Sequence, residues 1–237
     1  MNVLVIGGGG REHAICVSIS NSNLLDKLYC VPGNPGIEDV ATCIEGDIMN
    51  NDFILDVCKE NSIDFVIVGP EAPLTNGVVD ILNSEDIYVF GPDSKAAELE
   101  GSKIFMKDLC KKYEIPSSAY ETFFDADSAI SYLESQNMPI VVKANGLAAG
   151  KGAIVCVDQE AAINALYDCM EDKVFGAAGS TVVVEEYLEG KEISVFAFSD
   201  GEQVSSLVVA SDYKRLLDGN RGPNTGGMGS FTPVPEW

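Results

Sequence analysis

Histidine is almost absent from this sequence: His13 is its one example, and none of the seven cysteines belongs to a C-x-x-C pair. Zinc centres use several His or Cys ligands at short, regular spacings, so no zinc site of a familiar type is expected. The number of cysteines is odd, and most of them lie inside apolar runs. Buried, reduced thiols of a cytosolic protein are therefore the expected state of these side chains.

Basic residues are also scarce. The 237 residues include 15 Lys and Arg against 37 Asp and Glu, a formal net charge of −22. A surface of this sign repels nucleic acid and anionic membranes, so neither is an expected partner. No apolar run approaches the roughly 20 residues that span a bilayer, and no basic segment precedes an apolar N-terminal stretch, so the chain is expected to be cytoplasmic. Any anionic ligand must be held locally, by backbone N–H groups and a few Lys or Arg.

The composition is otherwise that of a globular protein, with 46% hydrophobic and 22% charged residues. In the first hundred residues, short apolar runs alternate with helix-length amphipathic segments. The strands are expected at residues 3–6, 27–31, 64–68 and 87–90, and the helices at 12–20, 52–61 and 78–82. This alternation predicts a doubly wound, Rossmann-like parallel sheet of the α/β class, whose ligands bind at the carboxyl ends of the strands.

A second pattern follows a boundary near residues 94–101. A basic helical stretch at 103–113 leads into a small α+β unit. Its strands are expected at 119–124, 140–143, 153–157 and 181–185, and its helices at 126–135 and 159–170. A hairpin is expected over 193–198 and 204–210, and little regular structure from Asp218 onward. The predicted divisions are 1–101, a linker helix region at 102–118, a lid at 119–189 that moves over its ligand, and the start of a further sheet at 190–237.

The first motif that carries chemistry is a strand, a run of four glycines and a helix start at residues 3–13. Backbone N–H groups of such a turn, together with the helix N-terminus, favour a phosphate group. A dinucleotide fingerprint is disfavoured, because Glu12 occupies the place of its third glycine and the second strand runs into Pro32 instead of an acidic residue. A smaller phosphate ligand is the preferred interpretation, and a tight turn without a ligand is the alternative.

Two further motifs lie in the second half. A strand delivers Lys143, and a Gly/Ala loop follows that carries Lys151; because Gly152 takes the place of Ser or Thr, this is not a Walker loop. Such a hairpin could close over a triphosphate, and an ordinary hairpin is the alternative.

The segment 185–188 could offer its backbone to an adenine edge, with an acidic residue nearby for a ribose. A solvated pair of glutamates is the simpler interpretation of that segment.

The fourth motif comprises residues 211–215 and 222–229, where glycines stand beside Asn224 and Thr225. The glycines suggest backbone contacts to an anion, and a flexible terminal loop is the alternative.

Taken together and in this order, these blocks resemble the phosphoribosylamine–glycine ligases (glycinamide ribonucleotide synthetases) of the ATP-grasp superfamily. The matching stretches are residues 9–14, 32–36, 68–74, 99–103, 143–152, 185–188 and 222–229. The resemblance implies a pre-ATP-grasp domain followed by an incomplete ATP-grasp domain. It also implies ATP-dependent joining of glycine to 5-phosphoribosylamine through glycyl phosphate in purine synthesis, with Mg²⁺ or Mn²⁺, by a monomeric enzyme.

The resemblance also assigns candidate residues. ATP is expected to contact Lys103, Lys143, Gly146, Gly150, Lys151, Gly152, Glu185, Glu186, Tyr187, Leu188 and Glu192. Phosphoribosylamine is expected to contact Gly9, Gly10, Arg11, Glu12, Glu71, Asp212, Lys214, Asn224, Thr225, Gly226, Gly227 and Met228. Because the amine must reach glycyl phosphate formed beside ATP, the segments 7–10 and 224–229 are expected to share one cleft.

The sequence departs from the family in one respect. Family members continue into a segment with a Glu and an Asn that bind magnesium, and here those ligands are expected beyond Trp237, with no metal ligand in this chain. We therefore expect the 237 residues alone to be inactive. A non-catalytic fragment that binds a nucleotide or a phosphosugar is the alternative, and a dehydrogenase is a more distant one.

Overall fold

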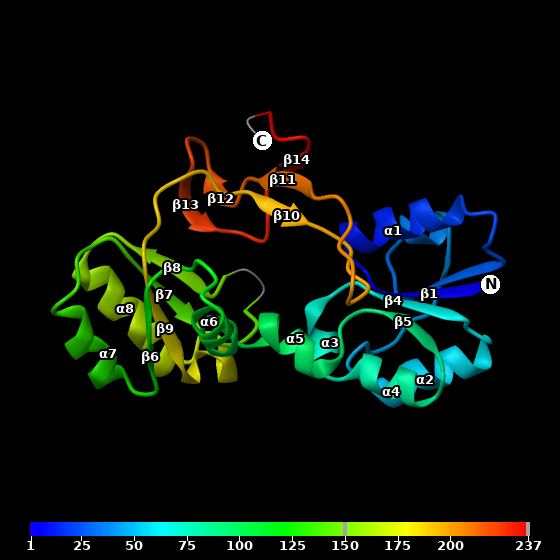
Figure 1. Cartoon of the computed structure of the whole chain (residues 1–237), viewed down its shortest axis with the longest axis horizontal. Helices are drawn as coiled ribbons and strands as arrows, with labels where there is room; N and C mark the ends of the chain where they lie inside the picture. The colour runs from blue at the N-terminus through cyan, green and yellow to red at the C-terminus, as the bar shows by residue number, and fades with distance from the viewer. Residues whose placement is uncertain (149–150, 236–237) are drawn as a thin grey trace. The chain divides into compact units, whose positions relative to one another are not determined.

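A computed structural model of the chain describes residues 1–148 and 151–235. The chain divides into two compact units, Met1–Met106 and Lys107–Trp237 (Figure 1). All seven cysteines are free thiols, and most are buried. In the part of the chain that the structure describes, no helix is both long and apolar enough to cross a lipid bilayer.

The first unit is built on a five-stranded parallel sheet with the order β3-β2-β1-β4-β5. Its strands are β1 (Asn2–Gly7), β2 (Lys27–Pro32), β3 (Thr42–Cys43), β4 (Phe65–Val68) and β5 (Tyr88–Phe90). Strand β1 is central, with Val5 opposite Cys30 of β2 and Ile67 of β4. The predicted doubly wound parallel sheet is confirmed, and its topology brings the carboxyl ends of β1, β2 and β4 to one edge.

Helices cover both faces of this sheet (Figure 1). They are α1 (Gly10–Ser20), η1 (Ile37–Asp39), α2 (Asn51–Glu60), α3 (Glu71–Thr75) and α4 (Val78–Ser84). The side chains of β1 alternate: Leu4 and Ile6 pack against α2 and α4, whereas Val3 and Val5 pack on the side of α1 and η1. All four are at most 3% exposed, so β1 is buried on both faces, as its uninterrupted apolar run predicts.

Residues 94–101, interpreted from the sequence as a boundary, form a helix, α5 (Ser94–Gly101). Asp93 caps its N-terminus, because the carboxylate accepts the Ala96 N–H at 2.8 Å. Helix α6 (Lys103–Lys112) follows.

The second unit contains a four-stranded antiparallel sheet with the order β6-β9-β7-β8. Its strands are β6 (Tyr120–Phe123), β7 (Ile140–Ala144), β8 (Ala153–Cys156) and β9 (Val182–Glu186), and α7 (Ala126–Leu133), α8 (Gln159–Met170) and η2 (Gly176–Ser180) accompany them. Val142 and Val184 face the core shared with the two α-helices. Because strand side chains alternate, Lys143 and Glu185 lie on the opposite face.

The last part of the chain forms short strands. β10 (Ser194–Phe196) pairs antiparallel with β11 (Val208–Asp212), which also pairs with β14 (Ser230–Phe231), while β12 (Arg215–Leu217) and β13 (Arg221–Asn224) form a hairpin. The expectation of little regular structure after Asp218 is therefore wrong for β13 and β14. Gly219, Asn220 and Gly222 all have a positive φ, from 56° to 84°, so the residues that looked like loop composition instead build the tight turn of the hairpin.

Candidate functional site

The glycine run at the end of β1 exposes its backbone at the start of α1. Gly7 has φ +125°, and a Cβ on Gly8 would lie 2.5 Å from the Gly33 carbonyl oxygen, so neither position tolerates a side chain in this conformation. Gly9 caps α1, and Gly9 and Gly10 are exposed. Exposed backbone at a helix N-terminus suits a phosphate, which is the ligand that the sequence predicts for this loop.

Glu12 lies beneath the loop. Its carboxylate, in a residue that is 3% exposed, accepts the Gly9 N–H at 2.7 Å and the Arg11 Nε–H at 2.7 Å. A Cβ on Gly69 would lie 2.2 Å from Glu12 Oε1, so the loop after β4 closes tightly over the same carboxylate. These contacts hold the loop in shape, and direct contact of Glu12 with a substrate stays a prediction.

Arg11 and Glu71 extend the same edge. Arg11 Nη1 lies 3.4 Å from Glu71 Oε1, and both side chains are about half exposed, at 53% and 49%. Partial burial opposes the charge of Arg11, but the carboxylates of Glu12 and Glu71 outweigh it and raise the pKa of the guanidinium. The sequence-predicted residues Gly9, Gly10, Arg11, Glu12 and Glu71 are therefore brought together at the carboxyl edge.

Asn34 was not among the candidates, yet it organises this edge. Its Nδ2 donates to the Gly8 carbonyl at 3.0 Å, and its Oδ1 accepts the N–H groups of Gly36 and Ile37 at 2.8 and 3.1 Å. Its place in the stretch 32–36, which matches the family directly after β2, was the available signal in the sequence.

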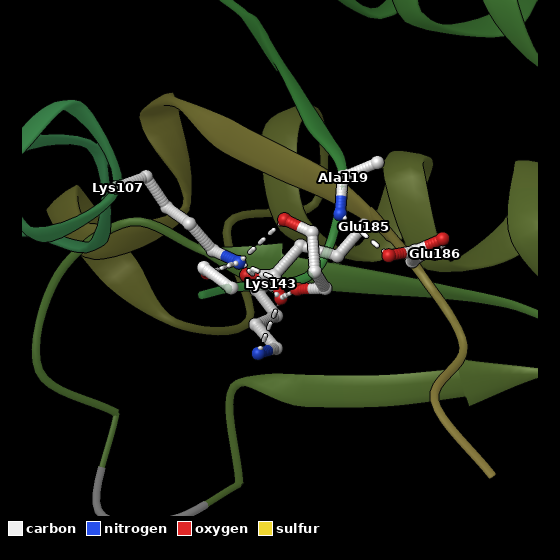
Figure 2. A network of polar contacts seen from close by, with 7 residues as sticks. Lys107, Ala119, Lys143, Glu185 and Glu186 are labelled. Carbon is white, nitrogen blue, oxygen red and sulfur yellow. Dashed lines mark hydrogen bonds and ion pairs between the residues drawn. The ribbon is translucent and has the colours of Figure 1, made fainter. Parts of the chain in front are cut away.

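A second cluster, shown in Figure 2, is a network of polar contacts around Glu185. Glu185 belongs to the four-stranded sheet and lies on the face opposite the core that Val142 and Val184 share with α7 and α8. Lys143 comes from β7, Glu185 from β9 and Lys107 from α6. Oxygen Oε2 of Glu185 lies 2.9 Å from Lys143 Nζ and 3.0 Å from Lys107 Nζ, and it accepts the hydroxyl of Ser118 at 2.6 Å. The side chains of Lys107 and Glu185 are 2% and 4% exposed, whereas Lys143 retains 27%.

The two oxygens of Glu185 have different surroundings. While Oε2 takes these contacts, Oε1 is buried without a hydrogen-bond partner among the residues that the structure describes. Burial by itself raises the pKa of this carboxyl, but hydrogen bonds from Ser118 and Lys143, with a further one from Lys107, hold the pKa below its ordinary value of 4.5. Glu185 is therefore ionised at neutral pH, and a solvated surface position is ruled out for it.

The chain that leaves β9 is open to solvent. Glu186 is exposed, and its Oε1 accepts the Ala119 N–H at 2.8 Å; Tyr187 and Leu188 are 41% and 63% exposed. In the glycine loop after β7, a Cβ on Gly146 would lie 2.8 Å from the Ala178 Cβ, and one on Gly152 would lie 2.5 Å from the Ala148 Cβ. Lys151 is exposed. The candidate Gly150 lies outside the described residues, and the predicted lid motion stays a prediction.

The remaining candidates gather in the last part of the chain. Lys214 Nζ lies 2.7 Å from Asp212 Oδ1 and 2.7 Å from Glu192 Oε1. Burial opposes its charge, but these two carboxylates outweigh it and raise the pKa of Lys214. Glu192, predicted for the ATP ribose, thus pairs with a lysine predicted for the other substrate.

Residues 224–228 are tied to the same strands. Thr225 N donates to the Lys214 carbonyl at 2.7 Å, as does Thr225 Oγ1 at 2.9 Å, and Met228 N donates to the Tyr213 carbonyl at 2.7 Å. Gly227 N donates to Thr225 Oγ1 at 3.1 Å. The predicted substrate segments 212–214 and 224–228 are therefore neighbours. Whether they share a cleft with residues 9–12 stays a prediction.

The architecture is that of ATP-grasp proteins. The biotin carboxylase domain of a 2-oxoglutarate carboxylase from Hydrogenobacter thermophilus, solved with MgADP, matches 88% of this chain and 48% of its own with a TM-score of 0.70 at 17% identity. Family models of phosphoribosylglycinamide synthetase match throughout, the N domain over residues 1–100 and the ATP-grasp (A) domain over residues 101–237. The chain belongs to this family, which confirms the family predicted from its motifs.

Individual relatives agree. The phosphoribosylamine–glycine ligase of Halalkalibacterium halodurans is 50% identical over 237 residues, which are 100% of this chain and 55% of the relative. The crystal structure of the phosphoribosylamine–glycine ligase from Thermotoga maritima matches with a TM-score of 0.83 and 31% identity, over 99% of this chain and 56% of that one. The chain therefore spans about half the length of the curated relatives it matches.

Proposed function

We propose that this chain forms the ATP- and phosphoribosylamine-binding parts of a phosphoribosylamine–glycine ligase. The reaction joins glycine to 5-phosphoribosylamine at the expense of ATP and yields glycinamide ribonucleotide, ADP and phosphate. The observation that carries the proposal is the cluster of Lys107, Lys143 and Glu185. Two ammonium groups around one carboxylate leave a surplus positive charge, in a chain that is otherwise strongly acidic. A polyanion such as a triphosphate complements that charge.

The chemistry of this reaction explains why the chain needs phosphate-binding loops and cationic side chains more than it needs nucleophilic side chains. A carboxylate is a poor acyl donor, so a glycine carboxylate oxygen first takes the γ-phosphoryl group of ATP, and ADP leaves. The amine of phosphoribosylamine then attacks the carbonyl carbon, the C–N bond forms, and phosphate and a proton are released. The protein contributes positioning and charge compensation to these steps.

The nucleotide contacts are proposed from the exposure and the chemical type of each side chain. Lys143, partly exposed beside Glu185, and Lys103 at the start of α6 would pair with phosphates. Gly146, Lys151 and Gly152 would lie over the phosphates. Residues 185–188 would hold the adenine, and Glu192 would take the ribose hydroxyls.

The second substrate is assigned to the other glycine-rich segments. Gly9, Gly10, Arg11 and Glu71 at the carboxyl edge, with residues 212–214 and 224–228, would bind phosphoribosylamine. The exposed backbone of Gly10 at the start of α1 and the guanidinium of Arg11 support a phosphate there, while the Gly9 N–H is already donated to Glu12.

The family implies a divalent cation, Mg²⁺ or Mn²⁺. Within residues 1–148 and 151–235, no group of three or more His, Cys, Asp or Glu side chains is arranged to hold one. The described residues do not fit a metal site, and no step of the reaction is assigned to one here.

The test measures ADP release with glycine, phosphoribosylamine, ATP and Mg²⁺. A protein of full family length that contains this chain should release ADP only when both other substrates are present. ADP release independent of either one would contradict the ligase assignment. The 237-residue chain by itself should bind ATP without forming product. Product from that chain alone would show that the expected metal ligands are not needed.

A further inference from the structure

Lys107 is the largest of the fully buried side chains in the described part of the molecule, and it was not among the predicted site residues. Its ammonium group is well satisfied: Nζ donates to Ser117 Oγ at 2.8 Å and to Ser118 Oγ at 2.5 Å and O at 3.2 Å, and it lies 3.0 Å from Glu185 Oε2. The Tyr120 ring covers it, with its centroid at 5.5 Å. A buried ammonium is costly unless it is compensated in this way, so Lys107 is fixed in place.

Lys143 differs from Lys107 in each of these respects. It keeps 27% of its side-chain surface, and among the described residues its ammonium contacts Glu185 Oε2 alone, at 2.9 Å. A phosphate group could therefore draw Lys143 away without leaving other buried groups unpaired. Lys107 cannot move in the same way, because three further contacts with Ser117 and Ser118 would be lost.

The charges decide what happens to Glu185 when Lys143 leaves. With Lys107 in place, the remaining pair is neutral, and Glu185 stays ionised. Without Lys107, the departure of Lys143 would strand a buried carboxylate, which would then take up a proton. Tyr120 of β6, which lies opposite Glu185 in the sheet, cannot compensate, because its hydroxyl donates to Asp108 at 2.8 Å.

The second oxygen of Glu185 supplies the link to a ligand. Oε1 is buried and has no hydrogen-bond partner among the described residues, so it is an acceptor in need of a donor. The exocyclic amine of adenine is such a donor, whereas the corresponding oxygen of hypoxanthine is not. Since Oε1 is buried, a base reaches it only after its surroundings move. Lys143, whose ammonium contacts the other oxygen of this carboxylate at 2.9 Å, is partly exposed.

We propose that Lys107 is a positioning residue for nucleotide selection: it keeps Glu185 ionised and oriented to accept the adenine amine while Lys143 is transferred to the phosphates. This inference rests on the proposed function, since it assumes that an adenine nucleotide binds beside Glu185. Lys107 itself touches no part of the nucleotide.

The test compares ATP with inosine triphosphate in the full-length protein. Lys107→Met removes the charge at similar length, and Lys107→Arg retains it. Lys111→Met is the matched control, because Lys111 is an exposed lysine one turn further along the same helix. For Lys107→Met, KM for ATP should rise at least about tenfold, because a protonated Glu185 no longer gives the adenine amine a charge-assisted contact, and kcat should change less. Preference for ATP over inosine triphosphate should fall, because protonated Glu185 can donate to the hypoxanthine oxygen.

The pH dependence separates this role from mere scaffolding. In Lys107→Met, the preference for ATP should recover as the pH is raised between about pH 6 and pH 9, since Glu185 ionises again. Lys107→Arg should restore most of the preference at neutral pH, and Lys111→Met should match the parent protein.

If Lys107→Met does not fold, the double variant Lys107→Met/Glu185→Gln removes both charges together. It should fold and accept both nucleotides, because an amide can accept or donate.

Two results would overturn the inference. One is that Lys107→Met, or the double variant, prefers ATP over inosine triphosphate as strongly as the parent protein does. The other is a loss of preference that does not change with pH. If the parent protein itself does not use ATP, the proposed function fails instead. An ATP-dependent parent whose Lys107→Met variant behaves like Lys111→Met refutes the positioning role alone.

Discussion

Replacing Gly69 with alanine should disturb the glycine loop of the first unit through Glu12. The new Cβ would lie 2.2 Å from Glu12 Oε1 and 2.7 Å from both Cγ and Cδ, closer than any real Cβ contact. Glu12 has little room to retreat, since it is 3% exposed and its oxygens accept Gly9 N and Arg11 Nε, each at 2.7 Å. Relief of the clash therefore requires the loss of at least one of these bonds.

The expected destabilisation has two parts. Overpacking a filled site costs about 1–3 kcal/mol, and a lost hydrogen bond to a charged group costs about 1.5–3 kcal/mol. Gly69→Ala should thus lower the free energy of unfolding by about 2.5–6 kcal/mol, a large share of the roughly 5–15 kcal/mol that holds a typical domain folded.

Chemical denaturation monitored by circular dichroism measures this change in the free energy of unfolding of the first unit. Gly10→Ala is the matched control, because its Cβ would meet nothing within 4 Å and it lies at the start of a helix. That variant should alter stability by no more than about 1 kcal/mol. In a double-mutant cycle, Gly69→Ala and Glu12→Ala should be strongly non-additive, because the second removes the group that clashes with the first. Equal stability of Gly69→Ala and Gly10→Ala would refute the reasoning.

Three other predictions concern the candidate sites. Lys143→Ala in the full-length protein should weaken ATP binding by about 1.5–3 kcal/mol, because a charge-assisted contact is lost. Titration calorimetry measures this change, with Lys111→Ala as the control. Unchanged ATP affinity would show that Lys143 does not contact the nucleotide. The pKa of Glu185 in the folded protein is held below 4.5, so ionised Glu185 stabilises the fold above that value. This stabilisation is lost as the pH falls through the folded pKa. The difference in unfolding free energy between the parent and Glu185→Gln should therefore shrink in acid. A gap that does not change with pH would mean that Glu185 is not stabilised in its charged form. A crystal structure of the full-length protein with phosphoribosylamine should place residues 224–228 beside residues 9–12, and ordered segments on opposite sides would dismiss the shared cleft.

Local patterns along the chain were enough to predict much of the fold. β1 is an unbroken apolar run and was expected as a buried strand. Helix α8 begins and ends where its amphipathic spacing indicates, with Asp158 as N-cap accepting the Ala161 N–H. Both signals depend on neighbours within a few positions, because burial periodicity and capping are properties of a short segment.

Short elements escaped prediction for the opposite reason. The two residues of β14 and the four of β13 carry no periodicity that can be recognised. They exist because β11 and β12 provide hydrogen-bond partners, which the composition of the segment, rich in Gly, Pro and Asn, does not reveal. Helix α5 was likewise not predicted, although its cap Asp93 was visible in the sequence.

The candidate site divides in the same way. Motif order was sufficient to identify the family, and it made Lys143, Glu185 and the glycine loops candidates. The sequence could not distinguish Glu185 from Glu186, which are adjacent and chemically identical. In strand β9 they point to opposite faces, so Glu185 becomes buried and Glu186 stays exposed.

Lys107 shows most clearly what only the tertiary structure decided. In the sequence it is one of several lysines in a basic helix, a pattern typical of a solvated surface. Its burial depends on Ser117 and Ser118, which follow the helix, and on Glu185 in a distant strand. A charged side chain can be buried only where partners from other segments compensate it, and the position of those partners is set by the packing of the sheet.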